Sequence, residues 1–139
     1  MGVGWQCLCV LFKIVFISVS AMKTEGSGPE PIDPNNEGVQ SSLDFAVQSF
    51  NFFTKDDHLF KVTRIVSAQI QDIGGLLYIL NVELGRTQCR KGVDENLMSC
   101  SIAKTAGTTE NLLCHFEVLS AFWRYEKDLL QSHCNPVNQ

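Results

Sequence analysis

The sequence predicts an α+β fold in which one long helix packs across a curved antiparallel sheet of roughly four to five strands. Three observations lead to this prediction. Apolar residues recur with helical spacing within residues 39–50, separate runs of alternating apolar residues follow, and four cysteines lie in the C-terminal half. A helix followed by several strands is typical of the α+β class, with the helix covering one face of the sheet.

The first 21 residues differ from the rest of the chain and resemble a secretory signal peptide. Residues 7–20 are mostly apolar and Ala21 leads into a polar stretch, so cleavage after Ser20 or Ala21 satisfies the small-residue rule. Lys13 interrupts the run and residues 1–6 contain no Lys or Arg, which leaves a retained membrane anchor as the alternative. Because a span needs roughly 18–20 apolar residues, we expect cleavage, a secreted extracellular protein and no membrane contact afterwards.

Residues 22–139 are expected to form a single domain that begins with a mobile N-terminal arm at residues 22–36. This arm is rich in Gly, Pro, Glu and Asn and shows no apolar periodicity. A helix is expected from about Glu37 to Phe53, with Asn35 or Asn36 as its N-cap. The apolar residues on one face of this helix are Val39, Leu43, Ala46, Val47 and Phe50.

Two runs of alternating apolar residues predict the first two strands of the main sheet. Arg64 and Ile65 break the first alternation, which indicates a bend or bulge. Between the runs, Gly74 and Gly75 permit the positive φ angles of a tight hairpin. The first run places Phe60, Val62, Val66, Ala68 and Ile70 on one face, and the second places Leu76, Tyr78, Leu80, Val82 and Leu84 on one face.

Two further strands are expected after a long connection. Residues 90–110 are polar without a firm pattern, and an apolar run at residues 112–118 then precedes Phe122 and Trp123. Leu129 and Leu130 lead into Cys134 as a last strand. No internal repeat is evident, so we expect one sheet and one core.

Composition and charge argue against nucleic-acid binding and catalysis. Apolar residues make up 45% of the chain and charged residues 19%, which is typical of a globular protein. The net charge is −4 and the eleven basic residues are scattered, whereas nucleic-acid binding needs clustered Lys and Arg. The acidic pairs Asp56–Asp57 and Glu126–Asp128 would need a cleft to act in catalysis, and a solvated surface is the simpler interpretation. We expect no enzymatic activity.

Loss of the leader leaves four cysteines, and their even number in a secreted domain indicates two disulfides. Three pairings are open, of which the sequential one closes two short loops. Cysteines committed to disulfides cannot act as nucleophiles. A zinc site would need short paired spacings of Cys and His. His115 follows Cys114 and His133 precedes Cys134, but adjacent residues rarely ligate one ion together. We therefore expect no metal and no cofactor.

Several segments together resemble the type 2, secreted cystatin family over nearly the whole mature chain. Residues 43–47 (Leu-Asp-Phe-Ala-Val) are similar to its central-helix segment, and residues 82–87 (Val-Glu-Leu-Gly-Arg-Thr) before Cys89 are similar to its third-strand signature. The four cysteines are similar in order and spacing. The resemblance implies a cystatin-like fold and the disulfides Cys89–Cys100 and Cys114–Cys134. It also implies reversible, noncovalent inhibition of papain-like, cathepsin-type cysteine proteases.

In this family an N-terminal arm and two hairpin loops together occlude the active-site cleft of the protease. The first hairpin carries Gln-x-Val-x-Gly, which corresponds here to Gln71, Asp72, Ile73, Gly74 and Gly75. A tip with two glycines is narrow, Ile73 offers apolar area, and Gln71 offers an amide that can donate and accept hydrogen bonds. The alternative is an ordinary tight turn that needs glycine.

The second hairpin and the arm depart from the family pattern. Phe122 and Trp123 stand where the family has Pro-Trp, so the restriction of φ by proline is lost. Trp123 is an expected interface anchor, the alternative being a core tryptophan. Ser27 stands where the family has a glycine, followed by Gly28, and Glu25 is a poor filler for an apolar substrate pocket. The alternative for the arm is a leader that makes no contact.

These departures leave a second function open, a secreted cystatin-fold binding protein with weak or no protease inhibition. The expected partners under the first function are papain-like cysteine proteases. We expect a monomer, with a domain-swapped dimer formed by exchange of the first hairpin as the alternative. Inhibition of a papain-like protease is the measurement that separates the two functions.

Overall fold

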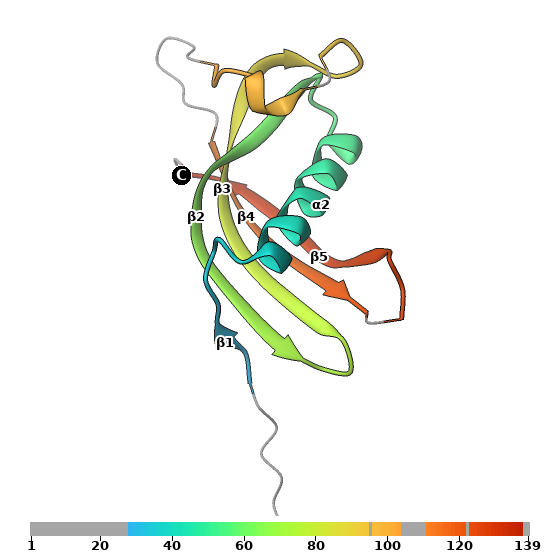
Figure 1. Ribbon diagram of the computed structural model, residues 1–139. Coiled ribbons are helices and arrows are strands. Elements are labelled where there is room, and N and C mark those ends of the chain that lie inside the picture. The colour runs from blue at the N-terminus through green and yellow to red at the C-terminus, as the bar shows by residue number, and fades with distance from the viewer. Residues whose placement is uncertain (1–27, 95, 104–110, 122, 138–139) are drawn as a thin grey trace, which may run out of the picture.

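The computed structural model describes residues 28–94, 96–103, 111–121 and 123–137. Its strands form one antiparallel sheet in the order β1-β2-β3-β4-β5, and the sheet curves around the single helix that lies across one face (Figure 1). The predicted α+β architecture is therefore confirmed over these residues. The elements are β1 (Glu30–Pro31), α2 (Glu37–Phe53), β2 (His58–Asp72), β3 (Leu76–Arg90), the 3-10 helix η1 (Leu97–Ser99), β4 (Asn111–Ser120) and β5 (Lys127–Pro136).

Helix α2 has the predicted bounds because both of its ends are capped. Asn36 is the N-cap, and its Oδ1 accepts hydrogen bonds from the backbone N–H groups of Gly38 at 2.8 Å and Val39 at 3.4 Å. At the other end Thr54 is extended and its N–H donates to the carbonyl of Phe50 at 2.9 Å. The polar caps thus satisfy backbone groups that a helix end leaves without partners.

The core lies between α2 and the inner face of the sheet. The helix and β3 each contribute four of the five residues of their predicted apolar faces, and the fifth residues, Phe50 and Leu76, are partly buried against the cluster. Apolar burial of this kind stabilises a fold by roughly 25 cal/mol per Å². The buried cluster consists of Val39, Leu43, Ala46, Val47, Phe60, Ala68, Tyr78, Leu80, Val82, Leu84, Cys114, Phe116 and Val118.

Strand β2 departs from the predicted alternation at Val66. Its register against β3 shifts between Val62 and Arg64 and again between Ile65 and Ser67, so Thr63 and Val66 have no cross-strand partner. The first shift places Ile65 opposite buried Val82 and so turns it toward the core, and the second leaves Val66 46% exposed. The predicted bulge is confirmed, whereas the placement of Val66 on the buried face was wrong. A bulge adds one residue and bends the strand, which fits the curvature of the sheet around α2.

The end of the expected arm is attached to β2. Strand β1 pairs antiparallel with β2, with Glu30 opposite Ile70 and Pro31 opposite Gln69, and Ile32 N–H donates to the carbonyl of Ala68 at 3.1 Å. Asp33 Oδ1 then accepts from Asn35 N–H at 2.9 Å, in the turn that leads into α2. The expected arm at residues 22–36 thus includes a short edge strand. Residues 22–27 and the expected leader at residues 1–21 lie outside the described residues.

Both disulfides implied by the cystatin resemblance are present. Cys89 is bonded to Cys100, with 5.7 Å between their Cα atoms, and Cys114 to Cys134, with 4.1 Å. The first attaches the connection after β3 to the end of that strand, and the second joins β4 to β5. The connection that the sequence left without a pattern contains η1 and a bridge between Thr87 and Ile102. Among the described residues, no helix has the length and apolar character needed to cross a membrane.

Candidate functional site

The tip of the β2–β3 hairpin is a short, internally bonded loop. Ile73 N–H donates to the carbonyl of Gly75 at 3.0 Å, and Gly74 N–H donates to Asp72 Oδ1 at 3.1 Å. Gly74 has a φ of +90°, a region that glycine enters without steric cost. These bonds orient Ile73 outward, where its side chain is 52% exposed.

Gly75 is favoured for a different reason from Gly74. Its φ is not positive, and it is buried against the end of β4. A Cβ at this position would lie 3.2 Å from Leu119 Cδ1 and 3.3 Å from the carbonyl oxygen of Ser120. Since Leu76 is also paired with Ser120, the base of the first hairpin packs directly against the segment where the second hairpin begins.

The loop between β4 and β5 presents Trp123. This side chain is 72% exposed, which excludes the alternative of a core tryptophan. The loop starts at buried Ala121, whose carbonyl accepts from Arg124 N–H at 3.4 Å, and the Arg124 side chain forms an ion pair with Asp128 on β5. Phe122, the other residue predicted here, lies outside the described residues. The contacts on either side of Trp123 support the loop while leaving its indole in solvent.

Tyr125 is an exposed aromatic residue that sequence reasoning did not single out. It lies in the same loop as Trp123 and is fully exposed, with a relative accessibility of 105%. The sequence offered one indication, since Tyr125 follows Trp123 by two residues in a stretch already predicted to be a loop. An aromatic ring on a loop adds apolar area without a large loss of side-chain entropy on binding.

The N-terminal segment approaches the same end of the sheet. Since β1 runs antiparallel to β2 with Glu30 opposite Ile70, the chain before Glu30 runs toward the tip of the β2–β3 hairpin. Gly28 is exposed, with no atom within 4 Å of a Cβ built on it. Ser27 lies outside the described residues. The described part of the arm therefore leads toward the tip of the first hairpin.

The strand order brings these three segments to one edge of the molecule, which we call the hairpin edge. It comprises Gly28 just before β1, the loop at residues 71–75 and the loop at residues 121–126. Figure 1 shows both loops and β1 at the same end of the sheet, away from the connection that contains η1. Ile73, Trp123 and Tyr125 give this edge an exposed apolar surface. A narrow apolar edge of this kind can enter a cleft.

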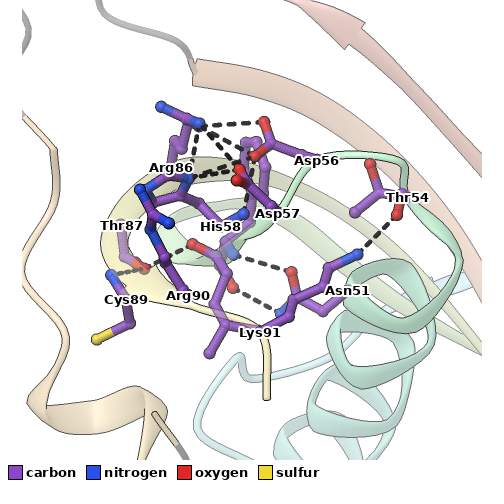
Figure 2. Close-up of polar contacts among 12 residues, drawn as sticks. Asn51, Thr54, Asp56, Asp57, His58, Arg86, Thr87, Cys89, Arg90 and Lys91 are labelled. Atoms are coloured by element: carbon purple, nitrogen blue, oxygen red, sulfur yellow. Dashed lines mark hydrogen bonds and ion pairs between the residues drawn. The ribbon is translucent and has the colours of Figure 1, made fainter. Parts of the chain in front are cut away.

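A polar cluster occupies the opposite end of the sheet, where α2 meets β2. Arg86 Nε lies 3.1 Å from Asp56 Oδ2, and its Nη2 lies 3.6 Å from Asp57 Oδ1 and 2.7 Å from His58 Nδ1 (Figure 2). The hydrogen bond with His58 holds the pKa of the Asp57 carboxyl below its usual value. Ligand atoms of Asp56, Asp57 and His58 lie within 4.8 Å of one another, as in a metal site. The guanidinium already supplies a positive charge there, so this cluster is a structural ion-pair network.

Further hydrogen bonds brace the loop beside this cluster. Lys91 Nζ donates to the carbonyl of Thr54 at 2.6 Å, and Lys91 N–H donates to the carbonyl of Asp57 at 2.9 Å. The buried Asn51 side chain bonds both backbone groups of Phe60, at 2.8 and 2.9 Å. All four cysteines that the structure describes are in disulfides, which leaves none of them as a nucleophile. Neither end of the described sheet therefore resembles a catalytic centre.

Comparisons with known proteins show which family and fold this chain resembles. A family model described as "Cystatin domain" matches residues 27–123. The chain is 38% identical over 106 residues to cystatin of Gallus gallus, covering 76% of each chain, and 33% identical over 130 residues to cystatin of Oncorhynchus mykiss, covering 94% of this chain and 97% of that protein. A crystal structure of dimeric human cystatin F superposes with a TM-score of 0.72 at 32% identity, covering 82% of this chain and 90% of that chain.

Proposed function

Since this chain belongs to the cystatin family, we propose that it is a secreted, reversible and noncovalent inhibitor of papain-like cysteine proteases. The observation that carries the proposal is the hairpin edge, where two exposed apolar side chains, Ile73 and Trp123, lie at the same end of the sheet. Its two disulfides support an extracellular location, because such bonds persist in oxidising compartments.

The first hairpin acts as a wedge that is shaped before it binds. The hydrogen bonds of Ile73 N–H and Gly74 N–H hold the tip in one conformation, so little backbone entropy is lost on entering the cleft. Ile73 contributes apolar area, and Gln71 contributes an amide close to the tip. Because the edge fills the cleft without presenting a scissile bond to the active-site cysteine, the complex remains noncovalent.

Trp123 is the anchor of the second hairpin. Burying its exposed surface removes on the order of 150–200 Å² of largely apolar area from water, a gross gain of about 4–5 kcal/mol before the costs of association. Interface residues of this type often dominate binding energy. Tyr125 adds further apolar area in the same loop.

The arm makes the weakest of the three contacts. Glu25 and Gly26 precede Ser27 where the family has apolar residues, so the arm offers little to an apolar substrate pocket. Affinity then depends mainly on the two hairpins. We further propose that the inhibitor acts as a monomer, because exchange of the β2–β3 hairpin between chains would straighten the tip at Ile73 and remove the wedge.

Steady-state inhibition of papain tests this function. The wild-type protein is expected to inhibit reversibly and in competition with substrate. Ile73→Asp and Trp123→Ala are each expected to raise the inhibition constant by about tenfold or more, because each removes an apolar contact of the edge. Phe53→Ala is the matched control, since Phe53 is 79% exposed but lies at the C-terminal end of α2. It should leave the constant unchanged.

Two outcomes would overturn the proposal. A folded wild-type protein that shows no inhibition of papain-like proteases at micromolar concentrations would instead be a cystatin-fold binding protein without inhibitory activity. Strong inhibition that survives both Ile73→Asp and Trp123→Ala would place the contact elsewhere on the molecule. Circular dichroism of each variant ensures that a change in inhibition does not arise from unfolding.

A further inference from the structure

Two of the three histidines of the chain face each other on the side of the sheet away from α2. His115 on β4 is the cross-strand partner of His133 on β5, next to the bonded pair Cys114 and Cys134. Since side chains alternate along a strand and Cys114 is buried toward the helix, both histidines lie on the outer face. Directly opposed side chains in an antiparallel pair have Cβ atoms about 5 Å apart.

His115 is held in place by polar groups at both ring nitrogens. Its Nδ1 lies 2.8 Å from Asn81 Oδ1 on β3, and its Nε2 lies 2.8 Å from Glu117 Oε2. Asn81 is itself oriented, because its Nδ2 donates to Ser67 Oγ at 3.0 Å. The side chains of His115 and Glu117 are 34% and 24% exposed, so the pair is shielded on one side and open on the other.

The two contacts of His115 place more acceptor atoms around the ring than a neutral imidazole has hydrogens to donate. Both of its partners are oxygen acceptors, whereas a neutral imidazole carries a hydrogen on only one nitrogen. With that hydrogen on Nδ1 facing Asn81, the Nε2 lone pair faces the Glu117 carboxylate, and either a second proton or a bound metal ion stabilises this contact. A hydrogen bond from Nδ1 to a carbonyl oxygen is also the arrangement that fixes metal-ligating histidines.

His133 completes the set of ligands when its side chain turns toward His115, because the ligand atoms of His115, Glu117 and His133 do not all lie within 4.8 Å of one another in the structure. It is exposed on the edge strand β5, where its Nε2 is 3.1 Å from Asn135 Nδ2, a contact that is broken by rotation of the side chain. Tetrahedral zinc has bonds of about 2.0–2.2 Å to nitrogen and oxygen, which places two ligand atoms about 3.3 Å apart. The observed 2.8 Å between Nε2 of His115 and Oε2 of Glu117 needs to widen by only about half an ångström.

We propose that His115, Glu117 and His133 form a binding site for a divalent transition metal, with Zn²⁺ as the preferred ion. The ligands would be Nε2 of His115, the carboxylate of Glu117 and a ring nitrogen of His133, with water in the fourth position. Two imidazoles and one carboxylate suit zinc, copper or nickel better than calcium or magnesium. Asn81 is a positioning residue, because it acts through His115. The sequence predicted no metal, because the histidines were considered with their neighbouring cysteines and not with each other.

Calorimetric titration of Zn²⁺ into the tag-free, chelator-treated protein at neutral pH tests the site. We expect one ion per chain with a dissociation constant in the micromolar range, and weaker binding at pH 5.5 because protons compete for the imidazoles. His133→Asn should weaken binding at least tenfold and leave the fold intact, since its side chain is exposed. Asn81→Ala should weaken binding about tenfold or more through loss of the support to His115.

The remaining histidine provides the control. His58→Asn removes the histidine of the Asp56–Asp57–Arg86 cluster and should leave the zinc affinity unchanged. Absence of Zn²⁺ binding by the folded wild-type protein would overturn the proposal, because a proton alone would then satisfy the contact between His115 and Glu117. Binding that His133→Asn leaves intact, or that His58→Asn abolishes, would overturn it as well. Papain inhibition, measured on the same samples, reports separately on the hairpin edge.

Discussion

At the contact between β3 and α2, the Tyr78 side chain occupies the space that a side chain at Gly38 would need. A Cβ at Gly38 would lie 2.0 Å from the Tyr78 hydroxyl oxygen and 2.7 Å from its Cζ, so the tyrosine ring leaves room only for glycine. Tyr78 is 5% exposed, and this burial raises the pKa of its phenol above the ordinary value. The buried position of the Tyr78 hydroxyl thus depends on the lack of a side chain at Gly38.

The titration of Tyr78 is therefore measurable. The chain has two tyrosines, so Tyr125→Phe leaves Tyr78 as the only source of tyrosinate absorbance. We expect a midpoint above the ordinary 10.0 while the protein remains folded. Because the folded state holds this proton more tightly than the unfolded state, the resulting stability is fully present below pH 10 and is lost as pH rises above it. A native midpoint at or below 10.0 would contradict this account.

Single residues of the site show what a sequence can and cannot predict. Gly74 and Gly75 are equivalent in a sequence, yet Gly74 is favoured by its φ of +90° and Gly75 by its close approach to the end of β4. That contact joins residues far apart in the chain, so no local pattern contains it. The opposition of His115 and His133 could be inferred, because the disulfide between Cys114 and Cys134 places the neighbouring residues opposite each other.

At the scale of elements, the predicted bounds and buried faces were accurate where the apolar residues keep one helical or strand period throughout the segment. Helix α2 was predicted to the residue, because its apolar spacing and its Asn36 cap agree. Strand β3 alternates without interruption through its central residues, and its buried face was also correct. Strand β2 contains three register shifts against β3, and the two that flank Arg64 and Ile65 each move the following residues to the opposite face. The sequence indicated a bulge there but not its consequence for Val66.

Elements stabilised by distant pairing were not predicted at all. Strand β1 has two residues, and its identity comes from pairing with Ile70 and Gln69 of β2. The 3-10 helix η1 lies in a polar connection and is followed directly by Cys100, which is bonded to Cys89. In both cases the conformation depends on a partner strand or a disulfide, neither of which leaves an apolar period in the segment itself.

Asn51 joins two elements by hydrogen bonds at the C-terminal end of α2. Its Oδ1 accepts from Phe60 N–H at 2.8 Å and its Nδ2 donates to the Phe60 carbonyl at 2.9 Å. We expect Asn51→Ala to lower the free energy of unfolding by about 2–3 kcal/mol, because it leaves two backbone groups of β2 without partners in a buried place. Urea unfolding measures the loss. Gln48→Ala, an exposed position on the same helix, should stay within about 0.5 kcal/mol of wild type.

At the scale of the whole molecule, the proposed binding surface and the ion-pair cluster lie at opposite ends of the sheet. The hairpin edge lies at one end of β2 and β3, and the cluster of Asp56, Asp57, His58 and Arg86 lies at the other. At about 3.3 Å per residue, β2 separates the two ends by roughly 40 Å. Charges at that distance are screened, because the Debye length is about 10 Å at 0.1 M salt. Substitutions in the ion-pair cluster should therefore change the free energy of unfolding, and substitutions at the hairpin edge should change protease inhibition.

Arg86→Gln tests this separation. Its side chain and that of Asp56 are 24% and 25% exposed, and the substitution leaves two carboxylates close together without their cation. We expect the free energy of unfolding to fall by about 1–2 kcal/mol, while papain inhibition stays within about twofold of wild type. Trp123→Ala is the reciprocal variant, since its exposed side chain adds little to stability but much to the proposed contact. Loss of inhibition by a folded Arg86→Gln protein would contradict the separation, because it would require a conformational change transmitted along β2 and β3 to the hairpin tip.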